Sequence, residues 1–175
     1  RDIKKKELVL SNVQILGLKY YEDLKKEIPR DEIKLHEIAL KETLCKIDKD
    51  AQLTVAGSYR RNKPSSGDID VLLRADDSTT YNQFINQLKE ENYLIEDLAY
   101  GSKKYNGISK INSEGLGRRI DIMYTKPCEY PFAILYFTGS GDFNKMMRKA
   151  VLEKGLSINE YGLRYKKDKK LIDHT

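Results

Sequence analysis

Residues 53–73 read LTVAGSYRRNKPSSGDIDVLL, and this stretch carries most of the information about the fold. Its first four residues are apolar or β-branched and predict a short strand, and its last six predict a second strand after a Pro-Ser-Ser-Gly turn. Asp68 and Asp70 are two residues apart on the second strand, so both carboxylates leave the same face. A solvated pair of aspartates at a strand edge has the same spacing. The spacing alone therefore does not distinguish a functional pair from a solvated one.

The neighbours of this pair suit a bound phosphate. Gly57 and Ser58 end the first strand and offer backbone N–H groups and a hydroxyl. Arg61 follows, and a guanidinium can hold a phosphate through two hydrogen bonds. Gly67 comes directly before Asp68 and lets an anion approach the backbone closely. Phosphate-binding groups and carboxylates are therefore expected at one place.

A third carboxylate, Asp121, lies on one face of a strand predicted at residues 118–124. Carboxylates held close together repel each other, which favours a raised pKa or a bound cation. Oxygen donors beside a phosphate suit Mg²⁺. Three carboxylates with two magnesium ions form the arrangement used for in-line phosphoryl transfer.

The rest of the chain alternates between helical and strand periodicity, which predicts an α+β fold with a mixed sheet. One amphipathic helix is expected to begin near Pro29, and another to be capped by Ser78 or Thr79. A third helix is expected to place an apolar stripe in the core, with three basic residues facing outward. The stripe is Phe143, Met146, Met147, Ala150 and Val151, and the basic residues are Lys145, Arg148 and Lys149.

Composition excludes several classes of protein. The chain has 175 residues, 39% of them hydrophobic, which suffices for one domain with a core. No apolar run is long enough to span a membrane and the first residues do not form a signal peptide, so we expect an intracellular protein without a membrane partner. Two cysteines, Cys45 and Cys128, are too few for a disulfide scaffold or a zinc cluster and favour a reducing compartment. Cys45 is expected to be buried.

The net charge of +5 is concentrated near the C-terminus, where residues 142–170 hold nine basic and four acidic side chains. A local basic field suits nucleic acid, and a solvated lysine-rich face fits equally well. The Lys166–Lys170 run has the same two interpretations. Scattered tyrosines such as Tyr93, Tyr100 and Tyr105 are expected to pack rather than stack on bases. His36 and His174 have no evident partners, and we expect neither to be catalytic.

Taken together, four motifs resemble family X DNA polymerases, the family of DNA polymerase beta. They occur in the family's order: GSYRR with SSGDIDVLL, RRID at 118–121, YFTGS at 136–140, and the segment from 143 to 161. The resemblance covers most of residues 17–162. It implies a nucleotidyltransferase-type palm with a mixed β-sheet and flanking helices, plus a small α/β C-terminal subdomain.

The resemblance also implies roles for individual residues. Asp68, Asp70 and Asp121 would be the catalytic metal ligands for two Mg²⁺ ions, with Mn²⁺ as a substitute. The nucleotide would be bound by Ser58, Arg61, Ser66, Gly67, Tyr136, Phe137, Gly139 and Asn144. DNA would be contacted by Arg119, Lys145 and Arg148.

The implied function is template-directed, gap-filling DNA synthesis by a monomer, with gapped or nicked primer-template DNA and a dNTP as partners. An untemplated nucleotidyltransferase on the same palm and an inactive DNA-binding fragment are the alternatives. Three parts are expected: a helical lead-in (1–50), the palm (51–130) and a nucleotide- and template-binding subdomain (131–175) that ends early. The compartment would be the nucleus in a eukaryote, or the cytoplasm for a viral or bacterial protein.

The sequence departs from the family pattern at three of its positions. Glu27 and Met123 each replace an arginine, and Gly141 replaces an aspartate beside the base. The arginine at position 123 would partner the middle aspartate, so an opening switch of the family type is not expected here.

Overall fold

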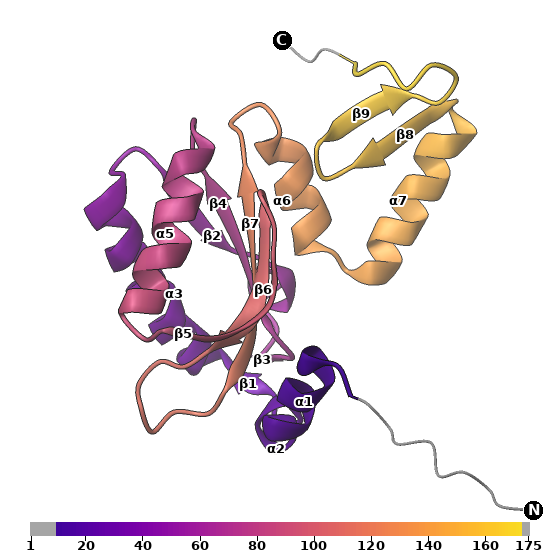
Figure 1. Cartoon of the computed structure of the whole chain (residues 1–175). Helices are drawn as coiled ribbons and strands as arrows, with labels where there is room; N and C mark the ends of the chain where they lie inside the picture. Colours follow the sequence, from indigo (N-terminus) through magenta and orange to yellow (C-terminus); the bar gives the residue numbers. More distant parts are fainter. Residues whose placement is uncertain (1–9, 173–175) are drawn as a thin grey trace, which may run out of the picture.

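The computed structural model describes residues 10–172. At its centre is a five-stranded sheet in the order β2-β4-β7-β6-β5 (Figure 1). Only β4 and β7 are parallel, and the other neighbours are antiparallel. The strands are β2 (Gln52–Val55), β4 (Ile69–Arg74), β5 (Leu94–Tyr100), β6 (Lys104–Ser109) and β7 (Arg118–Thr125).

Two long helices, α3 (Arg30–Ile47) and α5 (Ser78–Glu90), cover one face of this sheet (Figure 1). Helix α3 begins directly after Pro29, as expected. The cap of α5 is Asp77, whose side chain accepts a hydrogen bond from the Thr79 N–H, so the expected cap at Ser78 or Thr79 is wrong by one or two residues. The main core lies between helices and sheet, and its fully buried members include Ile33, Leu40, Phe84, Ile85, Ile69, Val71, Ile120 and Tyr124.

The opposite face of the sheet carries the even-numbered β4 residues and the odd-numbered β7 residues. Leu72 and Met123 from this face form a second apolar cluster with Ala133 of helix α6 (Tyr130–Thr138). Strand alternation therefore separates two environments, a largely apolar one towards α3 and α5 and a mixed one towards α6.

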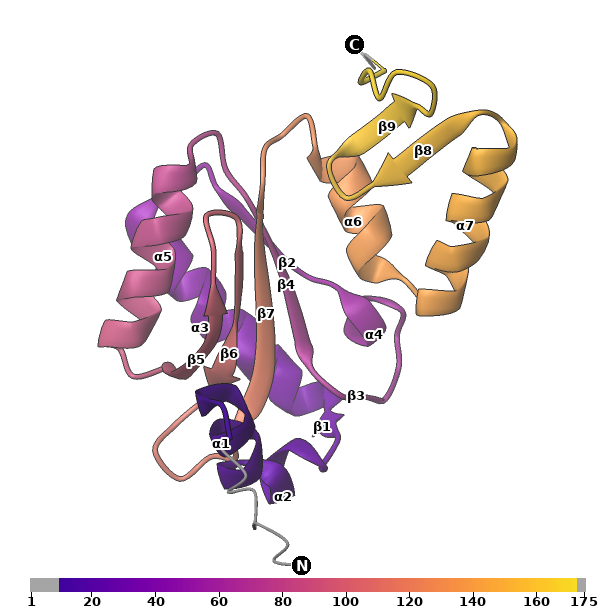
Figure 2. The same ribbon diagram turned by 45° about the vertical axis from the view of Figure 1, so that its right-hand side comes forward.

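A small C-terminal unit follows β7 (Figures 1 and 2). It contains α6, α7 (Gly141–Glu153) and the antiparallel pair β8 (Leu156–Asn159) and β9 (Gly162–Tyr165). The expectation that the α7 stripe is core is wrong, because no α7 residue is buried and the Phe143 and Met146 side chains are 38% and 67% exposed. Helix α7 lies at the outer edge of the unit, so no second layer covers this stripe.

Short elements surround the sheet at its lower end. They are α1 (Asn12–Lys19), α2 (Tyr21–Leu24), β1 (Ile28–Pro29), α4 (Gly57–Arg60) and β3 (Ser65–Ser66), with β1 and β3 paired. The expected α+β fold with a mixed sheet, flanking helices and a small C-terminal α/β unit is confirmed. Between residues 10 and 172, no helix has both the length and the apolar character needed to cross a membrane.

The predicted packing of the tyrosines is confirmed, whereas the predicted burial of Cys45 is wrong. Tyr93 and Tyr105 are buried, and Tyr100 packs edge-on against the Tyr105 ring, which confirms packing roles for these three. Cys45 is exposed, against expectation, because it lies one residue beyond buried Leu44 and so faces away from the core. His174 lies outside the described residues.

Candidate active site

The three carboxylates are brought together by the one parallel strand pair. Asp70 on β4 lies directly opposite Asp121 on β7 in the register, and Asp68 comes one residue before β4 begins. All three point away from the core, because the residues that alternate with them, Ile69 and Ile120, are fully buried on the other face. One oxygen from each carboxylate lies within 4.8 Å of the others.

The site is electrostatically strained without a cation. Burial, together with the charges of Asp68 and Asp121, raises the pKa of Asp70 to about 7, against the opposing effect of Arg119 and Arg61. The Arg119 guanidinium Nη2 is 2.6 Å from Asp68 Oδ2 and 3.7 Å from Asp121 Oδ2. The Arg119 guanidinium thus offsets part of the charge of Asp68 and Asp121.

The donor set fits a divalent metal ion. Asp121 Oδ1 is buried and has no hydrogen-bond partner among the residues that the structure describes. A buried, unpaired anionic oxygen is costly unless a cation or proton satisfies it. Clustered carboxylate oxygens are the ligands of hard cations, so the acidic triad is able to bind metal.

The loop after β2, which leads into α4 (Figure 2), lies against the Asp70 carboxylate and forms one side of the site. Ala56 donates its N–H to the Asp70 carbonyl, and Gly57 then takes a φ of +53° as α4 begins. A Cβ on Gly57 would overlap the Asp70 carboxylate, so only glycine lets the loop approach this closely. Ser58 Oγ donates to Ser66 Oγ over 2.6 Å, which ties the loop to β3.

Helix α6 and the start of α7 form the other side. Arg61 Nη1 donates to the Thr138 carbonyl over 2.5 Å, linking the loop to the end of α6. Asn144 Nδ2 donates to the Tyr136 carbonyl over 2.8 Å, and the Arg148 guanidinium lies 5.2 Å from the centre of the Tyr136 ring. Gly139, at φ +67°, turns the chain between the two helices.

These walls enclose a cavity of about 420 Å³, a volume suited to a small-molecule ligand. The candidate residues that line it are Asp68, Asp70, Asp121, Ser58, Arg61, Tyr136, Phe137, Gly139 and Asn144. Five candidates lie outside the lining. Ser66 is buried behind Ser58, Arg119 binds Asp68, Arg148 lies on Tyr136, Lys145 pairs with Asp142, and the space beside Gly67 is open.

The cavity residues that sequence reasoning missed include Lys104 and Asn106 on β6. Asn106 pairs with Asp121 and Lys104 with Met123 in the β6–β7 register. Their alternation with buried Tyr105 marks them as one face of a strand, but only the sheet order places that face beside the aspartates.

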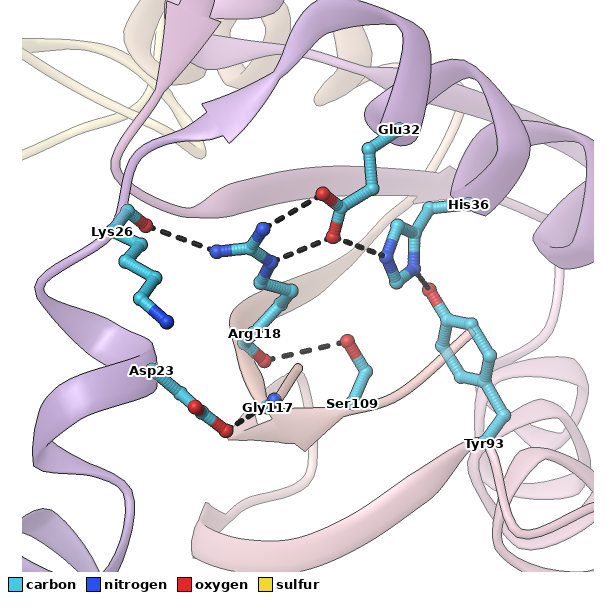
Figure 3. A network of polar contacts seen from close by, with 8 residues as sticks. All are labelled: Asp23, Lys26, Glu32, His36, Tyr93, Ser109, Gly117 and Arg118. Atoms are coloured by element: carbon cyan, nitrogen blue, oxygen red, sulfur yellow. Dashed lines mark hydrogen bonds and ion pairs between the residues drawn. The ribbon is translucent and has the colours of Figure 1, made fainter. Parts of the chain in front are cut away.

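A buried polar network fixes the start of β7 (Figure 3). Arg118, which is 4% exposed, donates to both Glu32 oxygens over 2.6 and 2.7 Å and to the Lys26 carbonyl over 3.0 Å. His36 has a partner after all, since its Nδ1 is 2.7 Å from the Tyr93 hydroxyl. The network holds α3 against the strand that carries Arg119 and Asp121.

Comparison with known proteins agrees with this architecture. The family model for the DNA polymerase beta palm matches residues 27–127, and the DNA polymerase beta thumb model matches residues 133–175. The chain is 31% identical to DNA polymerase lambda of Rattus norvegicus over 88% of its own length, and 25% identical to DNA nucleotidylexotransferase of Xenopus laevis over 90%. It superposes on Leishmania infantum polymerase beta in a ternary gap complex with a TM-score of 0.85 and 34% identity, covering 90% of this chain and 57% of that one.

The chain spans only part of these relatives. It covers 29% of the rat DNA polymerase lambda and 39% of the Xenopus transferase.

Proposed function

The chain belongs to the family X DNA polymerases, the family of DNA polymerase beta, and we propose that it adds dNMP to a primer 3′-hydroxyl under the direction of a template. One observation carries the proposal. The acidic triad, the Gly57–Arg61 loop and the Tyr136–Asn144 segment meet in a single cavity, although they come from three distant parts of the chain.

Residues in and beside this cavity would hold the different parts of the nucleotide. Ser58, Arg61 and the Gly67 N–H would hold the triphosphate, with Ser66 orienting Ser58 through their hydrogen bond. Tyr136, Phe137 and Gly139 would line the sugar, and Asn144 the base. In phosphoryl transfer the protein itself forms few or no covalent bonds to the substrate. Positioning and charge neutralisation therefore account for most of the catalysis.

Asp68, Asp70 and Asp121 would hold two Mg²⁺ ions, for which Mn²⁺ would substitute. Such ions supply charge neutralisation at the phosphates and a more acidic 3′-hydroxyl. The chain's own contribution is to hold the carboxylates in register, which the β4–β7 pairing of Asp70 with Asp121 supports.

DNA would lie along the basic groups beside the cavity. Arg119 would approach the primer-end phosphate, and Arg148 and Lys145 the template side, because all three project from the rim and not into the core. Gapped or nicked primer-template is the proposed substrate. Since the whole cavity comes from one chain, we propose that the protein works as a monomer.

The proposed parts are the lead-in (1–50), the palm (51–130) and the nucleotide- and template-binding subdomain (131–175). Helix α3 at the end of the lead-in shares the palm's core. The exposed residues Lys126 and Cys128, between β7 and α6, support the second boundary. Both cysteines are free and exposed, which supports a reducing intracellular compartment. That compartment would be the nucleus if the source is a eukaryote.

The test is primer extension on gapped, recessed and blunt DNA, with each dNTP supplied alone in Mg²⁺ or Mn²⁺. Incorporation only of the complementary nucleotide supports the proposal. Sequence-independent tailing would support untemplated transfer, and binding without incorporation would support an inactive DNA-binding fragment. Asp121→Ala should abolish incorporation with DNA binding retained, and Asp97→Asn, an acidic residue on β5 outside the cavity lining, is its control.

A further inference from the structure

An ion pair at the edge of the cavity joins the turn between β8 and β9 to the palm sheet. Lys104 is the first residue of β6, and Glu160 lies in the turn between β8 and β9. The Lys104 Nζ is 2.6 Å from Glu160 Oε1, and the two side chains are 44% and 13% exposed. The carboxylate is thus largely removed from water, whereas the ammonium stays partly solvated.

The neighbouring residue supports the same contact. The Tyr161 ring lies with its centre 4.8 Å from the Lys103 Nζ and 5.8 Å from the Lys104 Nζ, at cation–π distances. Tyr161 also packs against the second apolar cluster, which includes Met123. The turn is therefore attached through one aromatic ring and one ion pair.

Both charges are present at neutral pH. Burial lowers the pKa of Lys104, but the hydrogen bond to Glu160 more than offsets this, and the net pKa is raised. Burial raises the pKa of Glu160, but the hydrogen bond from Lys104, a hydrogen bond from its own backbone N–H and the charges of Lys104 and Arg148 leave it lowered. Glu160 is a largely buried anion that depends on Lys104 for neutralisation.

Lys104 also lines the cavity that the proposed function assigns to the nucleotide. Without Lys104, the Glu160 carboxylate would be unpaired at the edge of a site for a triphosphate. An unpaired anion there would repel the ligand, since partly buried charges are only weakly screened.

We propose that Lys104 is a positioning residue that acts through Glu160. It holds the β8–β9 turn against the sheet and neutralises Glu160, so that the cavity accepts an anionic nucleotide. This role rests on the proposed function for its ligand, but the ion pair itself can be tested without catalysis.

The experiment is a double-mutant cycle of Lys104→Met, Glu160→Gln and the double variant. Binding of dCTP is measured in Mg²⁺ with a gapped DNA that has template guanine in the gap and a dideoxy-terminated primer, so that no chemistry occurs. Lys104→Met should weaken dCTP binding on the order of tenfold, equivalent to about 1.4 kcal/mol. The double variant should return to within about twofold of the wild type, because the unpaired carboxylate is then gone.

Further measurements distinguish a positioning role of Lys104 from a catalytic role and from a general effect on stability. With an extendable primer, Lys104→Met should raise KM for dCTP and leave kcat nearly unchanged. In thermal unfolding without ligand, the two substitutions should be non-additive. Lys89→Met and Asp97→Asn, which break an ion pair of 2.5 Å outside the cavity lining, should leave dCTP binding unchanged.

Two results would overturn the proposal. If the double variant binds dCTP as weakly as Lys104→Met, the lysine contacts nucleotide or DNA itself and does not act through Glu160. If unfolding effects simply add, the pair contributes nothing to the docking of the turn. Failure of the proposed function would look different, because the wild type would then extend no primer although the coupling in thermal unfolding persisted.

Discussion

Gly57 lies directly against the carboxylate of Asp70, so the loop that would hold phosphate and the central aspartate of the triad are in contact. Strand β4 and the loop after β2 are also joined by the hydrogen bond from the Ala56 N–H to the Asp70 carbonyl, 2.8 Å long. An atom added at Gly57 must therefore displace the Asp70 carboxylate.

Gly57→Ala should reduce nucleotide incorporation by about a hundredfold or more, because the added methyl group would displace Asp70 from its place opposite Asp121. Gly155→Ala is the matched control. Gly155 has φ +73° but open space around it, so it bears a similar backbone cost without a collision. Equal losses of kcat/KM in the two variants would show that backbone strain, and not the Asp70 contact, is responsible.

Asp70→Asn should stabilise the metal-free protein at pH 8 by at least about 1 kcal/mol, and much less at pH 4. The pKa of Asp70 is about 7 in the folded protein, above its ordinary value of 3.8. The folded state therefore binds the extra proton, and stability falls as pH rises through this window. Melting curves in EDTA at both pH values provide the measurement, and destabilisation at pH 8 would contradict a shared anionic site.

Arg61→Ala should raise KM for dNTP about tenfold and change DNA affinity little, because its guanidinium lines the cavity. Arg60→Ala is the control, since Arg60 donates to the Thr138 hydroxyl and does not line the cavity. Steady-state kinetics and DNA binding are measured on the same gapped substrate. Loss of DNA affinity with KM unchanged would make Arg61 a DNA contact instead.

The Tyr136–Gly139 segment should select deoxyribose. Its backbone turns sharply at Gly139. If the sugar binds against this turn, a 2′-hydroxyl would lack space and a partner, so we expect dNTP to be preferred over rNTP about a hundredfold, for a penalty of about 3 kcal/mol. Tyr136→Ala should reduce this preference, and a bulky residue at Gly139 should impair both sugars. The measurement is kcat/KM for dGTP and GTP opposite template cytosine, and equal values in the wild type would exclude a sugar filter here.

His36→Gln should make the free energy of unfolding depend less on pH below about 6.5. Burial lowers the pKa of His36 to about 4 from 6.5, with Glu32 opposing and Arg118 assisting the shift. The unfolded chain thus takes up a proton that the folded protein does not, and stability falls by up to about 1.4 kcal/mol per unit as pH drops from 6.5 towards 4. Glutamine keeps a partner for the Tyr93 hydroxyl (Figure 3) without titrating. Denaturant unfolding at several pH values measures the difference, and parallel curves would contradict the prediction.

The local order of residues determined the strands and the kind of chemistry at the site. Alternation on β4 and β7 was enough to predict strands and to place Asp68 and Asp70 on one face, because side-chain direction in a strand depends only on position along the chain. The conjunction of a glycine-serine turn, arginines and this pair was enough to indicate phosphoryl transfer.

Only the tertiary structure decided which distant residues share the cavity. Asp121 lies opposite Asp70 because β4 and β7 are parallel neighbours, and Lys104 reaches Glu160 because β6 lies beyond β7. Burial was decided in the same way. The α7 stripe has the helical period of a core helix but lies at the outer edge. His36 is buried, and its ring contacts Tyr93, a residue 57 positions later in the sequence. Periodicity fixes the direction of a side chain relative to its own element, whereas strand order and layer packing fix what that side chain meets.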